Sequence, residues 1–338
     1  MLVSELVGAV LTRPIVDVDA ASAFLERTWG VVGDLRPLPS ERDRNVAVAV
    51  DRIDRFVLKI SNASEDRAFL ELQHEALRRL VAAGVPCQEP LPTAAGDDLA
   101  VIAREPPLLA RVLTWLPGRP LVTIPPDERS PELLADLGRV MGRTAAALVG
   151  LDHPGAHRPF QWSAEEGLAV IAAHAGAVVD ENRATLLARW QRRLARLQCF
   201  LPTLRHGVIH NDANDHNVLV ADDGASISGL LDLGDAVWSV TVNELAVAAA
   251  YAALRTADPI ATIAAVRAGF EEALPLIDPE GGLLIELVAL RLATSVALSA
   301  HQSRLDPDDP YLTVSEAPAW ALLERLLETP PPTIEPGR

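Results

Sequence analysis

Residues 208–220, VIHNDANDHNVLV, carry the strongest signal of fold and chemistry in this chain. An apolar run leads into His210 and Asp212, and Asn217 follows five residues after the aspartate. A second stretch, GLLDLGDAVW (229–238), ends its own apolar run at Asp232, twenty positions after Asp212. Both runs predict short strands, so these polar side chains are expected at strand ends, where functional sites usually lie.

These residue types, in this order, suit phosphoryl transfer. Asp212 can orient an attacking hydroxyl group and accept its proton. Mg²⁺ prefers hard oxygen ligands, which the Asn217 amide and the Asp232 carboxylate supply while leaving room for phosphate oxygens. His210 is expected to be a structural hydrogen-bonding residue rather than a proton shuttle. Each motif alone is also typical of a turn, because Asp and Asn side chains cap the backbone there.

Nearer the N-terminus, RFVLKI (55–60) contains the only lysine of 338 residues, Lys59. A lone lysine on a strand could reflect a general preference for arginine. Nucleotide phosphates, however, favour a compact ammonium, which the planar fork of arginine does not replace. Glu75 follows sixteen residues later on a predicted helix and is the expected partner of Lys59, with Glu71 one helical turn earlier as the alternative.

The order of predicted elements indicates an α+β chain with two lobes. The first 30 residues are expected to form a helix, and residues 46–50 and 56–60 a hairpin. Residues 65–84 predict an amphipathic helix that ends at Gly84. Two further strands are expected at 99–102 and 110–116. Short apolar runs lie in the middle of the chain, at 207–210, 217–220 and 228–233. Helices are expected at 130–151, 181–201, 242–255, 259–273, 281–304 and 317–328.

This pattern divides the chain into four parts. Residues 1–113 are expected to form a small β-rich N-lobe with one key helix, and residues 114–118 a hinge. Residues 119–328 are expected to form a larger, mainly helical C-lobe. Residues 329–338 form a proline-rich tail, which is expected to be extended.

Composition narrows the classes of function. The net charge of −16 argues against a nucleic-acid surface, which needs a basic stripe. No stretch approaches twenty uninterrupted apolar residues, so no membrane partner is expected. Cys87 and Cys199 suggest reduced thiols, and the N-terminus lacks the features of a secretion signal. We therefore expect a cytoplasmic protein.

From about residue 20 to 328, the chain resembles the aminoglycoside phosphotransferase and choline kinase branch of the protein-kinase-like fold. The resemblance rests on SERDRN, FVLKI, LQHEAL, LTWLPG, HNDANDHNVLV and LLDLGDAVWSVTVNELAVAAAYA. These stretches more narrowly resemble the hydroxylysine kinase group. That module also occurs fused to class III aminotransferase-like domains, so such an enzyme is a possible fused or associated partner.

The resemblance implies a role for each matching position. Asp212 would be the catalytic base, and Asn217 and Asp232 would be the Mg²⁺ ligands. Lys59, paired with Glu75, would bind the α- and β-phosphates of the nucleotide.

Further roles concern loops around the nucleotide and the acceptor. Residues 39–45 would replace a glycine-rich phosphate loop, with Ser40 and Asn45 near the phosphates. The backbone from Thr114 to Leu116 would contact the base. The remaining candidates order loops or face the acceptor: Asp235 and Glu244 would order the loop after Asp232, and Asp215 would face the acceptor.

Four positions depart from the pattern of the family. Val46 stands where Phe is usual, so the phosphate loop would pack differently. Asn211 replaces a glycine, but Asn tolerates a positive φ, so little effect is expected. Glu244 and Ser163 both stand where Asp is usual. None of these changes touches the transfer chemistry.

The predicted activity is transfer of the γ-phosphoryl group of ATP or GTP to the hydroxyl of a small amine-bearing alcohol. Hydroxylysine or a related amino alcohol is the first choice, because Asp215 and Asp235 could offset an ammonium, although both could equally cap their loops. An aminoglycoside or other antibiotic is the alternative acceptor. A catalytically silent nucleotide-binding module that regulates an aminotransferase-like partner is the alternative of another class, but the presence of Asp212 argues against it.

Overall fold

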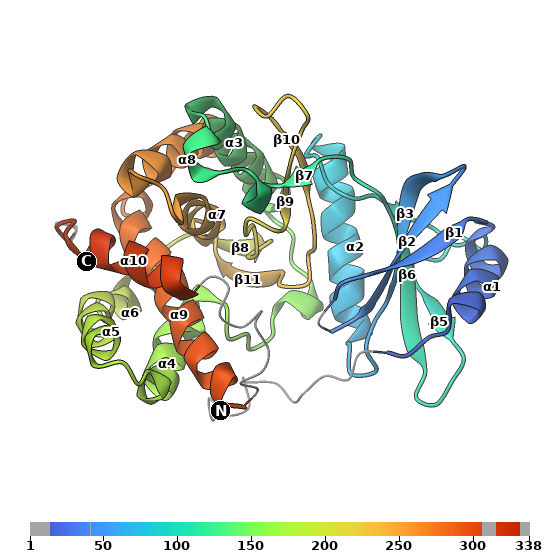
Figure 1. Cartoon of the computed structure of the whole chain (residues 1–338), viewed down its shortest axis with the longest axis horizontal. Helices are drawn as coiled ribbons and strands as arrows, with labels where there is room; N and C mark the ends of the chain where they lie inside the picture. The colour runs from blue at the N-terminus through green and yellow to red at the C-terminus, as the bar shows by residue number, and fades with distance from the viewer. Residues whose placement is uncertain (1–13, 41, 306–315, 332–338) are drawn as a thin grey trace.

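The computed structural model describes residues 14–40, 42–305 and 316–331. A β-sheet with helix α1 (Val18–Trp29) lies at one end of the molecule, a helical lobe lies at the other, and helix α2 (Arg67–Ala82) stands between them (Figure 1). Most of the predicted proline-rich tail lies outside the described residues. So do residues 1–13 of the predicted N-terminal helix, whose described part begins only at Val18.

The N-terminal sheet is antiparallel in the order β1-β2-β3-β6-β4, with β5 paired to β6. The predicted hairpin of β2 and β3 is confirmed, and Asn45 pairs with Lys59 in its register. Asp51 and Arg52 both have positive φ in the turn, as a tight hairpin requires. The strands are β1 (Asp34–Leu38), β2 (Arg44–Val50), β3 (Ile53–Ile60), β4 (Pro90–Leu91), β5 (Ala100–Ile102) and β6 (Leu108–Thr114).

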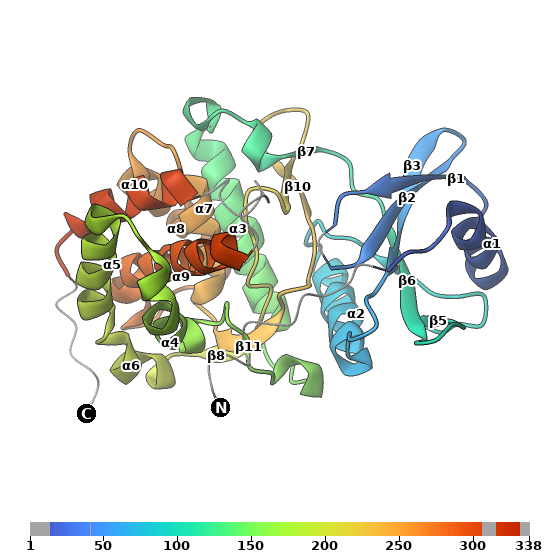
Figure 2. The same ribbon diagram turned by 60° about the horizontal axis from the view of Figure 1, so that its bottom comes forward.

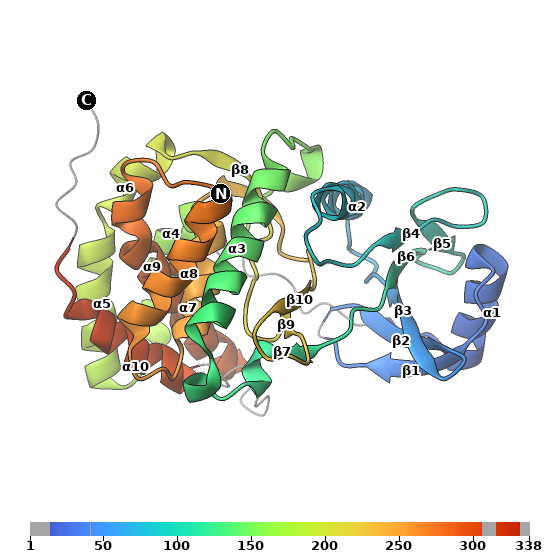
Figure 3. The same cartoon turned by 90° about the horizontal axis from the view of Figure 1, so that it is seen from above.

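Helix α2 belongs to the same hydrophobic core as the helical lobe. Asp66 caps its N-terminus, and one face of this helix, which was predicted to be amphipathic, is buried with Leu70, Leu77 and Leu80. Strands β2, β3 and β6 share a separate core with α1. The side chains of α2 that join the C-lobe cluster are Phe69, Leu72, Ala76, Leu77 and Leu80. Figure 3 shows α2 between the sheet and α3 (Pro131–Leu148). The helix therefore shares its hydrophobic core with the C-lobe rather than with the sheet.

The C-terminal part is mainly helical, as predicted. Ser130 caps α3 and Pro131 occupies its first turn, whereas α4 was not among the predicted helices. The other α-helices are α4 (Ala164–His174), α5 (Glu181–Leu194), α6 (Leu197–Phe200), α7 (Asn243–Ala253), α8 (Pro259–Ala273), α9 (Leu284–Leu305) and α10 (Glu316–Leu327). Short 3₁₀ helices are η2 (Leu121–Thr123), η3 (Pro126–Glu128), η4 (Pro154–Ala156), η5 (Ala175–Ala177), η6 (Leu201–Thr203) and η7 (Glu280–Leu283).

Helix α9 runs through the middle of this lobe, with α4, α7 and α10 packed around it (Figure 2). By length and composition alone, Glu280–Leu305 could cross a membrane. However, 83% of its most apolar window is buried inside the protein, as expected of a core helix.

Short strands position the two polar loops that the sequence singled out. Strands β10, β9 and β7 form one small sheet, and β11 pairs with β8. The loop with Asp212 joins β8 to β9, and the loop with Asp232 joins β10 to β11, so both loops lie together; the Leu231 N–H donates to the Asn217 carbonyl at 2.8 Å. The strands are β7 (Arg119–Pro120), β8 (His206–Ile209), β9 (Val218–Val220), β10 (Ile227–Leu230) and β11 (Val237–Val240).

Candidate active site

His210 joins the two polar loops and is fully buried. Its Nε2–H donates to the Leu231 carbonyl at 2.8 Å, and its Nδ1 accepts the Asp212 N–H at 3.2 Å. Burial lowers the pKa of His210 to about 4, so the ring is neutral near pH 7. With both ring nitrogens engaged, His210 orients Asp212, in agreement with the structural role expected for it.

Glu244 supports the loop that carries Asp212. We expected its carboxylate to order the loop after Asp232, but it instead accepts the His210 N–H at 2.6 Å from helix α7. Asn211 has φ +64°, which confirms that this position uses a positive φ. The Asn211 carbonyl oxygen of the side chain accepts from Asn243 at 3.0 Å. Burial raises the pKa of Glu244 to about 7.

Asp212 is held from both of its carboxylate oxygens. Asn217 Nδ2 donates to Oδ2 at 2.7 Å, while Asn214 Nδ2 and Arg291 Nη2 contact Oδ1 at 3.0 and 3.1 Å. Burial raises the pKa of Asp212 well above its ordinary value, the Asp235 carboxylate adds to this, and Arg291 opposes it. A raised pKa brings a carboxylate closer to the range in which it can accept a proton at neutral pH.

Asp232 and Asn217 carry the hard oxygen atoms that were expected to form a metal site. The Asp232 side chain is 43% exposed, and its Oδ1 contacts Lys59 Nζ at 3.3 Å and accepts the Gly234 N–H at 2.9 Å. The Lys59 ammonium holds the pKa of Asp232 well below its usual range. Because Asn217 Nδ2 faces Asp212, the amide oxygen of Asn217 is left for another partner. This donor set fits a divalent cation that completes its shell with phosphate oxygens.

The expected pair between Lys59 and Glu75 is not formed in this structure. Glu75 accepts from Arg79 at 3.1 Å, and the alternative, Glu71, pairs with Arg67 at 3.5 Å. Residues two apart point about 200° apart around a helix. The face that α2 turns to the sheet carries Gln73, and Glu75 therefore points elsewhere.

Gln73, rather than Glu75, is the α2 residue that contacts the sheet. Its Oε1 accepts from buried Arg111 Nη2 at 2.8 Å, and Arg111 is the neighbour of Lys59 across β3 and β6. Burial lowers the pKa of Arg111, and the nearby Asp43 and Asp232 carboxylates oppose this. Lys59 therefore lies beside a second buried cation and turns to Asp232.

The predicted phosphate loop reaches toward the loop after Asp232. Arg42 Nη1 lies 3.7 Å from Asp235 Oδ1, which is a contact that the sequence did not predict. Asn45 Oδ1 is buried and has no hydrogen-bond partner among the residues that the structure describes, as a group awaiting a ligand would be. Ser40 lies in this loop next to residue 41, which is outside the described residues, and Val46 is buried in the core of the sheet.

The predicted hinge offers fewer free backbone groups than expected. The Thr114 N–H donates to the Glu89 carbonyl at 2.9 Å, and the Thr114 carbonyl accepts from Gln88 Nε2 at 3.0 Å. The backbone of Leu116 makes no hydrogen bond to another residue among those that the structure describes. Leu116 is therefore the better placed of the two for contact with a base.

The sequence analysis missed Asn214, which contacts Asp212, and the group formed by Arg291, Trp162 and Tyr251. Arg291 of α9 contacts Asp212, and its guanidinium lies over the rings of Trp162 and Tyr251 at 4.5 and 5.7 Å. A single charged residue inside the apolar run LVALRLA of α9 is a signal that could have identified Arg291.

Asp215, the expected acceptor-side residue, is buried, and its backbone carbonyl accepts the Val122 N–H at 2.8 Å.

Arg158 ties α2 to the loop after Asp232. Its guanidinium lies 4.2 Å from the centre of the Phe69 ring on α2 and 4.0 Å from that of Phe160. Its Nη2 also donates to the Gly234 and Ala236 carbonyls, each at 3.4 Å. The position of the Asp232 loop is thus coupled to α2.

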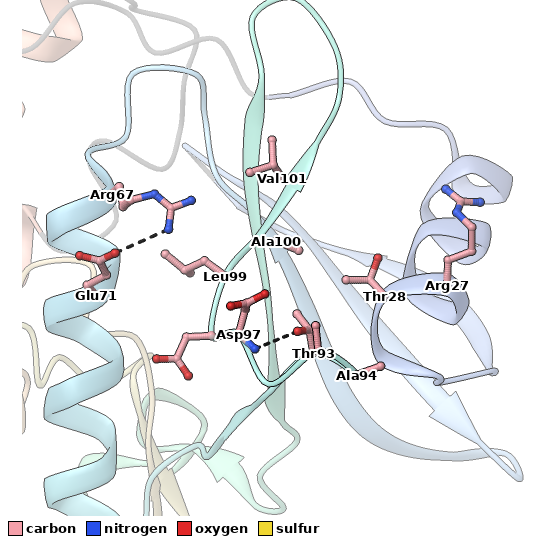
Figure 4. Close-up of a pocket in the computed structure, with 12 residues that line it drawn as sticks. Arg27, Thr28, Arg67, Glu71, Thr93, Ala94, Asp97, Leu99, Ala100 and Val101 are labelled. Atoms are coloured by element: carbon pink, nitrogen blue, oxygen red, sulfur yellow. Dashed lines mark hydrogen bonds and ion pairs between the residues drawn. The ribbon is translucent and has the colours of Figure 1, made fainter.

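A separate groove of about 740 Å³ lies on the N-lobe between α1, α2 and the segment before β5 (Figure 4). Its lining includes Arg67, Glu71, Asp97 and Asp98. None of the residues proposed for phosphoryl transfer lines it, so this groove is distinct from the site around Asp212.

The family model described as "Phosphotransferase enzyme family" matches residues 34–281. Hydroxylysine kinase from Bos taurus is 29% identical, over 94% of this chain and 91% of the relative. Among solved structures, a microcompartment-associated aminopropanol kinase matches with a TM-score of 0.72 and 19% identity, over 92% of this chain and 98% of its own. An amicoumacin kinase in complex with AMP-PNP and Ca²⁺ matches with a TM-score of 0.68 and 15% identity, over 95% and 96%.

The two structural matches confirm the expected protein-kinase-like fold with a β-rich N-lobe and a helical C-lobe. The family model covers most of both lobes, including every residue proposed for transfer. The chain therefore belongs to the phosphotransferase enzyme family, and it is a phosphotransferase with a hydroxyl group as its acceptor.

Proposed function

We propose that this enzyme transfers the γ-phosphoryl group of ATP or GTP to the hydroxyl of an amine-bearing small molecule, with hydroxylysine as the first candidate. The observation that carries the proposal is the arrangement around Asp212. Asn217 contacts Asp212 at 2.7 Å, and Lys59 contacts Asp232 at 3.3 Å in the neighbouring loop. Base, metal ligands and phosphate-binding cation thus come from adjacent loops and one strand.

In the proposed reaction, Asp212 accepts the proton of the acceptor hydroxyl as its oxygen bonds to the γ-phosphorus. The bond from that phosphorus to the β,γ-bridging oxygen breaks, and the nucleoside diphosphate leaves with the electron pair. Lys59 balances charge on the nucleotide phosphates. Asn217 and Asp232 would hold a divalent ion, Mg²⁺ in our proposal, which supplies charge neutralisation on the phosphate oxygens when bound.

The choice of acceptor rests on the relatives and on nearby charge. The Bos taurus relative is a hydroxylysine kinase, and the aminopropanol kinase of similar fold acts on an amino alcohol. The Asp235 carboxylate raises the pKa of the base Asp212, and the Asp215 carboxylate raises that of the nearby Tyr251. Both negative charges therefore act close to the base, which favours an ammonium group there. A cytoplasmic location and an aminotransferase-like partner that consumes the product are further parts of the proposal, based on the sequence alone.

The test is nucleoside-diphosphate release with ATP and with GTP against a panel of acceptors. The panel contains hydroxylysine, homoserine, threonine, ethanolamine, choline and several aminoglycosides, and Asp212→Asn serves as the blank. We expect hydroxylysine to stimulate release well above the blank. Stimulation by an aminoglycoside alone would replace hydroxylysine with the antibiotic class. Tight nucleotide binding without stimulation by any acceptor would contradict the proposed transfer.

A further inference from the structure

Arg111 is a buried cation in the sheet of the N-lobe. It is 2% exposed, and its Nη2 donates to Gln73 Oε1 at 2.8 Å. Its Nη1 is also buried, and it has no hydrogen-bond acceptor in the part of the chain that the structure describes. An unmet donor on a buried charged group is unfavourable, so it points to a ligand that meets it.

The register of the sheet places Arg111 on the same face as Lys59. The apolar side chains of β2, β3 and β6 that share a core with α1 occupy even-numbered positions, Leu58 and Val112 among them. Because side chains alternate along a strand, the odd-numbered positions face the other way. Asn45 pairs with Lys59, and Lys59 pairs with Arg111, so these three form one row across neighbouring strands (Figure 3).

A second row on this face indicates which part of a nucleotide Arg111 meets. Two residues nearer the predicted hinge, Ala47 pairs with Val57 and Val57 pairs with Leu113, and all three are buried. Two residues along a strand span about 6.7 Å. A base at the hinge, as expected from the sequence, suits this apolar row, and its phosphates then suit the row of Lys59 and Arg111.

Two carboxylates near the guanidinium come from the loops that are expected to surround the phosphates. Burial lowers the pKa of Arg111, and the carboxylates of Asp43 and Asp232 oppose this. Asp43 lies in the predicted phosphate loop, and Asp232 also contacts Lys59 Nζ at 3.3 Å. When a divalent ion binds Asp232, both cations lose part of the charge of that carboxylate, and phosphate oxygens can replace it.

A structural link between α2 and the sheet does not explain the charge of Arg111. Gln73 is neutral, so its contact accounts for Nη2 but does not compensate the buried charge. Neither Asp43 nor Asp232 accepts a hydrogen bond from Nη1. A neutral donor would hold Gln73 equally well, without the desolvation cost of a guanidinium. The charge is therefore expected to serve a charged ligand.

We propose that Arg111 is a second phosphate-binding residue, which donates from Nη1 to a phosphate oxygen of the nucleotide while Nη2 stays on Gln73. The two contacts use different nitrogens at the end of the guanidinium, so one side chain can make both. This inference rests on the proposed function, since it needs a nucleotide in this site, and it adds a second cation to Lys59.

The test measures binding of a nucleoside diphosphate and of its nucleoside, by displacement of a fluorescent nucleotide analogue. The diphosphate is ADP or GDP, whichever the wild-type enzyme binds more tightly, with adenosine or guanosine to match. In Arg111→Met, we expect affinity for the diphosphate to fall by roughly 10- to 100-fold, the size of a hydrogen bond to a charged group. Affinity for the nucleoside, which has no phosphate, should stay within about threefold of wild type.

Two variants serve as controls. Arg36→Met removes an exposed arginine from β1 of the same sheet and should change neither affinity. Gln73→Met removes the contact with α2 but keeps the charge of Arg111, so diphosphate affinity should stay within about threefold of wild type. Equal losses in Gln73→Met and Arg111→Met would overturn the proposal, because that pattern belongs to a link between α2 and the sheet.

The remaining outcomes separate this inference from the proposed function. Unchanged diphosphate affinity in Arg111→Met, or an equal loss for diphosphate and nucleoside, would overturn the role of Arg111 and leave the kinase function intact. A wild-type enzyme that binds neither ADP nor GDP would reject the function itself.

If Arg111→Met does not fold, Arg111→Lys decides. Lysine keeps the charge but has a single nitrogen for Gln73 and the phosphate, so affinity for the diphosphate should fall at least about threefold more than affinity for the nucleoside. Equal losses for the two would overturn the proposal.

Discussion

Lys59 Nζ lies 3.3 Å from Asp232 Oδ1, and this contact joins strand β3 of the sheet to the loop after β10. Lys59 is 8% exposed at its side chain, whereas the Asp232 side chain is 43% exposed. The ammonium is thus held by a proposed metal ligand rather than by a helix glutamate. In the presence of nucleotide, phosphate oxygens can share or replace this contact.

Lys59→Arg should lower kcat/KM for the nucleotide by at least about tenfold while the fold persists. The planar guanidinium is larger than an ammonium, and Arg111 already occupies the neighbouring position across the sheet. The measurement is steady-state kinetics with varied nucleotide, together with a thermal melt. Activity close to wild type would mean that Lys59 reflects only the preference of this chain for arginine.

Glu75→Gln is the matched control for Lys59→Arg, and it should keep kcat/KM within about fivefold of wild type. Its carboxylate is 45% exposed and pairs with Arg79 one helical turn away, a contact of little energetic value. A loss as large as that of Lys59→Arg would show that Glu75 moves to Lys59 when the nucleotide binds. That result would restore the pair expected from the sequence.

Asp212→Asn should lower kcat by about 10²- to 10⁴-fold, the usual contribution of a general base. The amide keeps the size of the side chain but cannot accept the proton of the hydroxyl. Binding of the metal–nucleotide complex, measured by calorimetry, should change little because Lys59, Asn217 and Asp232 are retained. Turnover near the wild-type rate would exclude Asp212 as the base.

Local sequence patterns were sufficient for the elements that carry the site. The runs 46–50 and 56–60 predicted β2 and β3, and the helix expected from residue 130 is α3, which begins at Pro131. The loops with Asp212 and Asp232 follow apolar runs and do lie together. In each case, the signal lies within a few residues along the chain.

Contacts between distant segments were not predictable in the same way. Spacing along the sequence suggested Glu75 for Lys59, but the direction of a side chain depends on the rotation of α2 against the sheet, which Gln73 and Arg111 set. Arg291 lies 79 positions from Asp212. Only the packing of α9 in the C-lobe brings the two together.

Glu244→Gln should change how stability depends on pH. Because burial raises the pKa of Glu244 from 4.5 to about 7, the folded protein favours the protonated carboxyl. The contribution of Glu244 to the free energy of unfolding is fully present below pH 4.5 and is lost as the pH rises through 7. At 1.36 kcal/mol per pKa unit, the loss is roughly 3 kcal/mol. Glutamine cannot ionise and should not show it.

The measurement for Glu244 is urea unfolding of both proteins at pH 5, 6, 7 and 8. The free energy of unfolding of Glu244→Gln minus that of wild type should rise across this series. The difference removes other titrating groups, including His210, whose lowered pKa acts in the opposite direction. A difference that stays constant with pH would mean that Glu244 is ionised in the folded protein throughout.

Arg158→Met should weaken binding of the metal–nucleotide complex more than it affects KM for the acceptor. The change removes the contacts with the Phe69 and Phe160 rings and both hydrogen bonds to the loop after Asp232. We expect the free energy of unfolding to fall by about 1–3 kcal/mol, in the range of a cation–π contact with partly buried hydrogen bonds.

Arg158→Lys keeps the charge without the planar fork, so its stability and its nucleotide affinity should lie between those of the wild type and of Arg158→Met. Urea unfolding and nucleotide calorimetry on the same preparations check this. A stability loss with unchanged nucleotide affinity would show that Arg158 only packs α2 against the C-lobe and does not position the Asp232 loop.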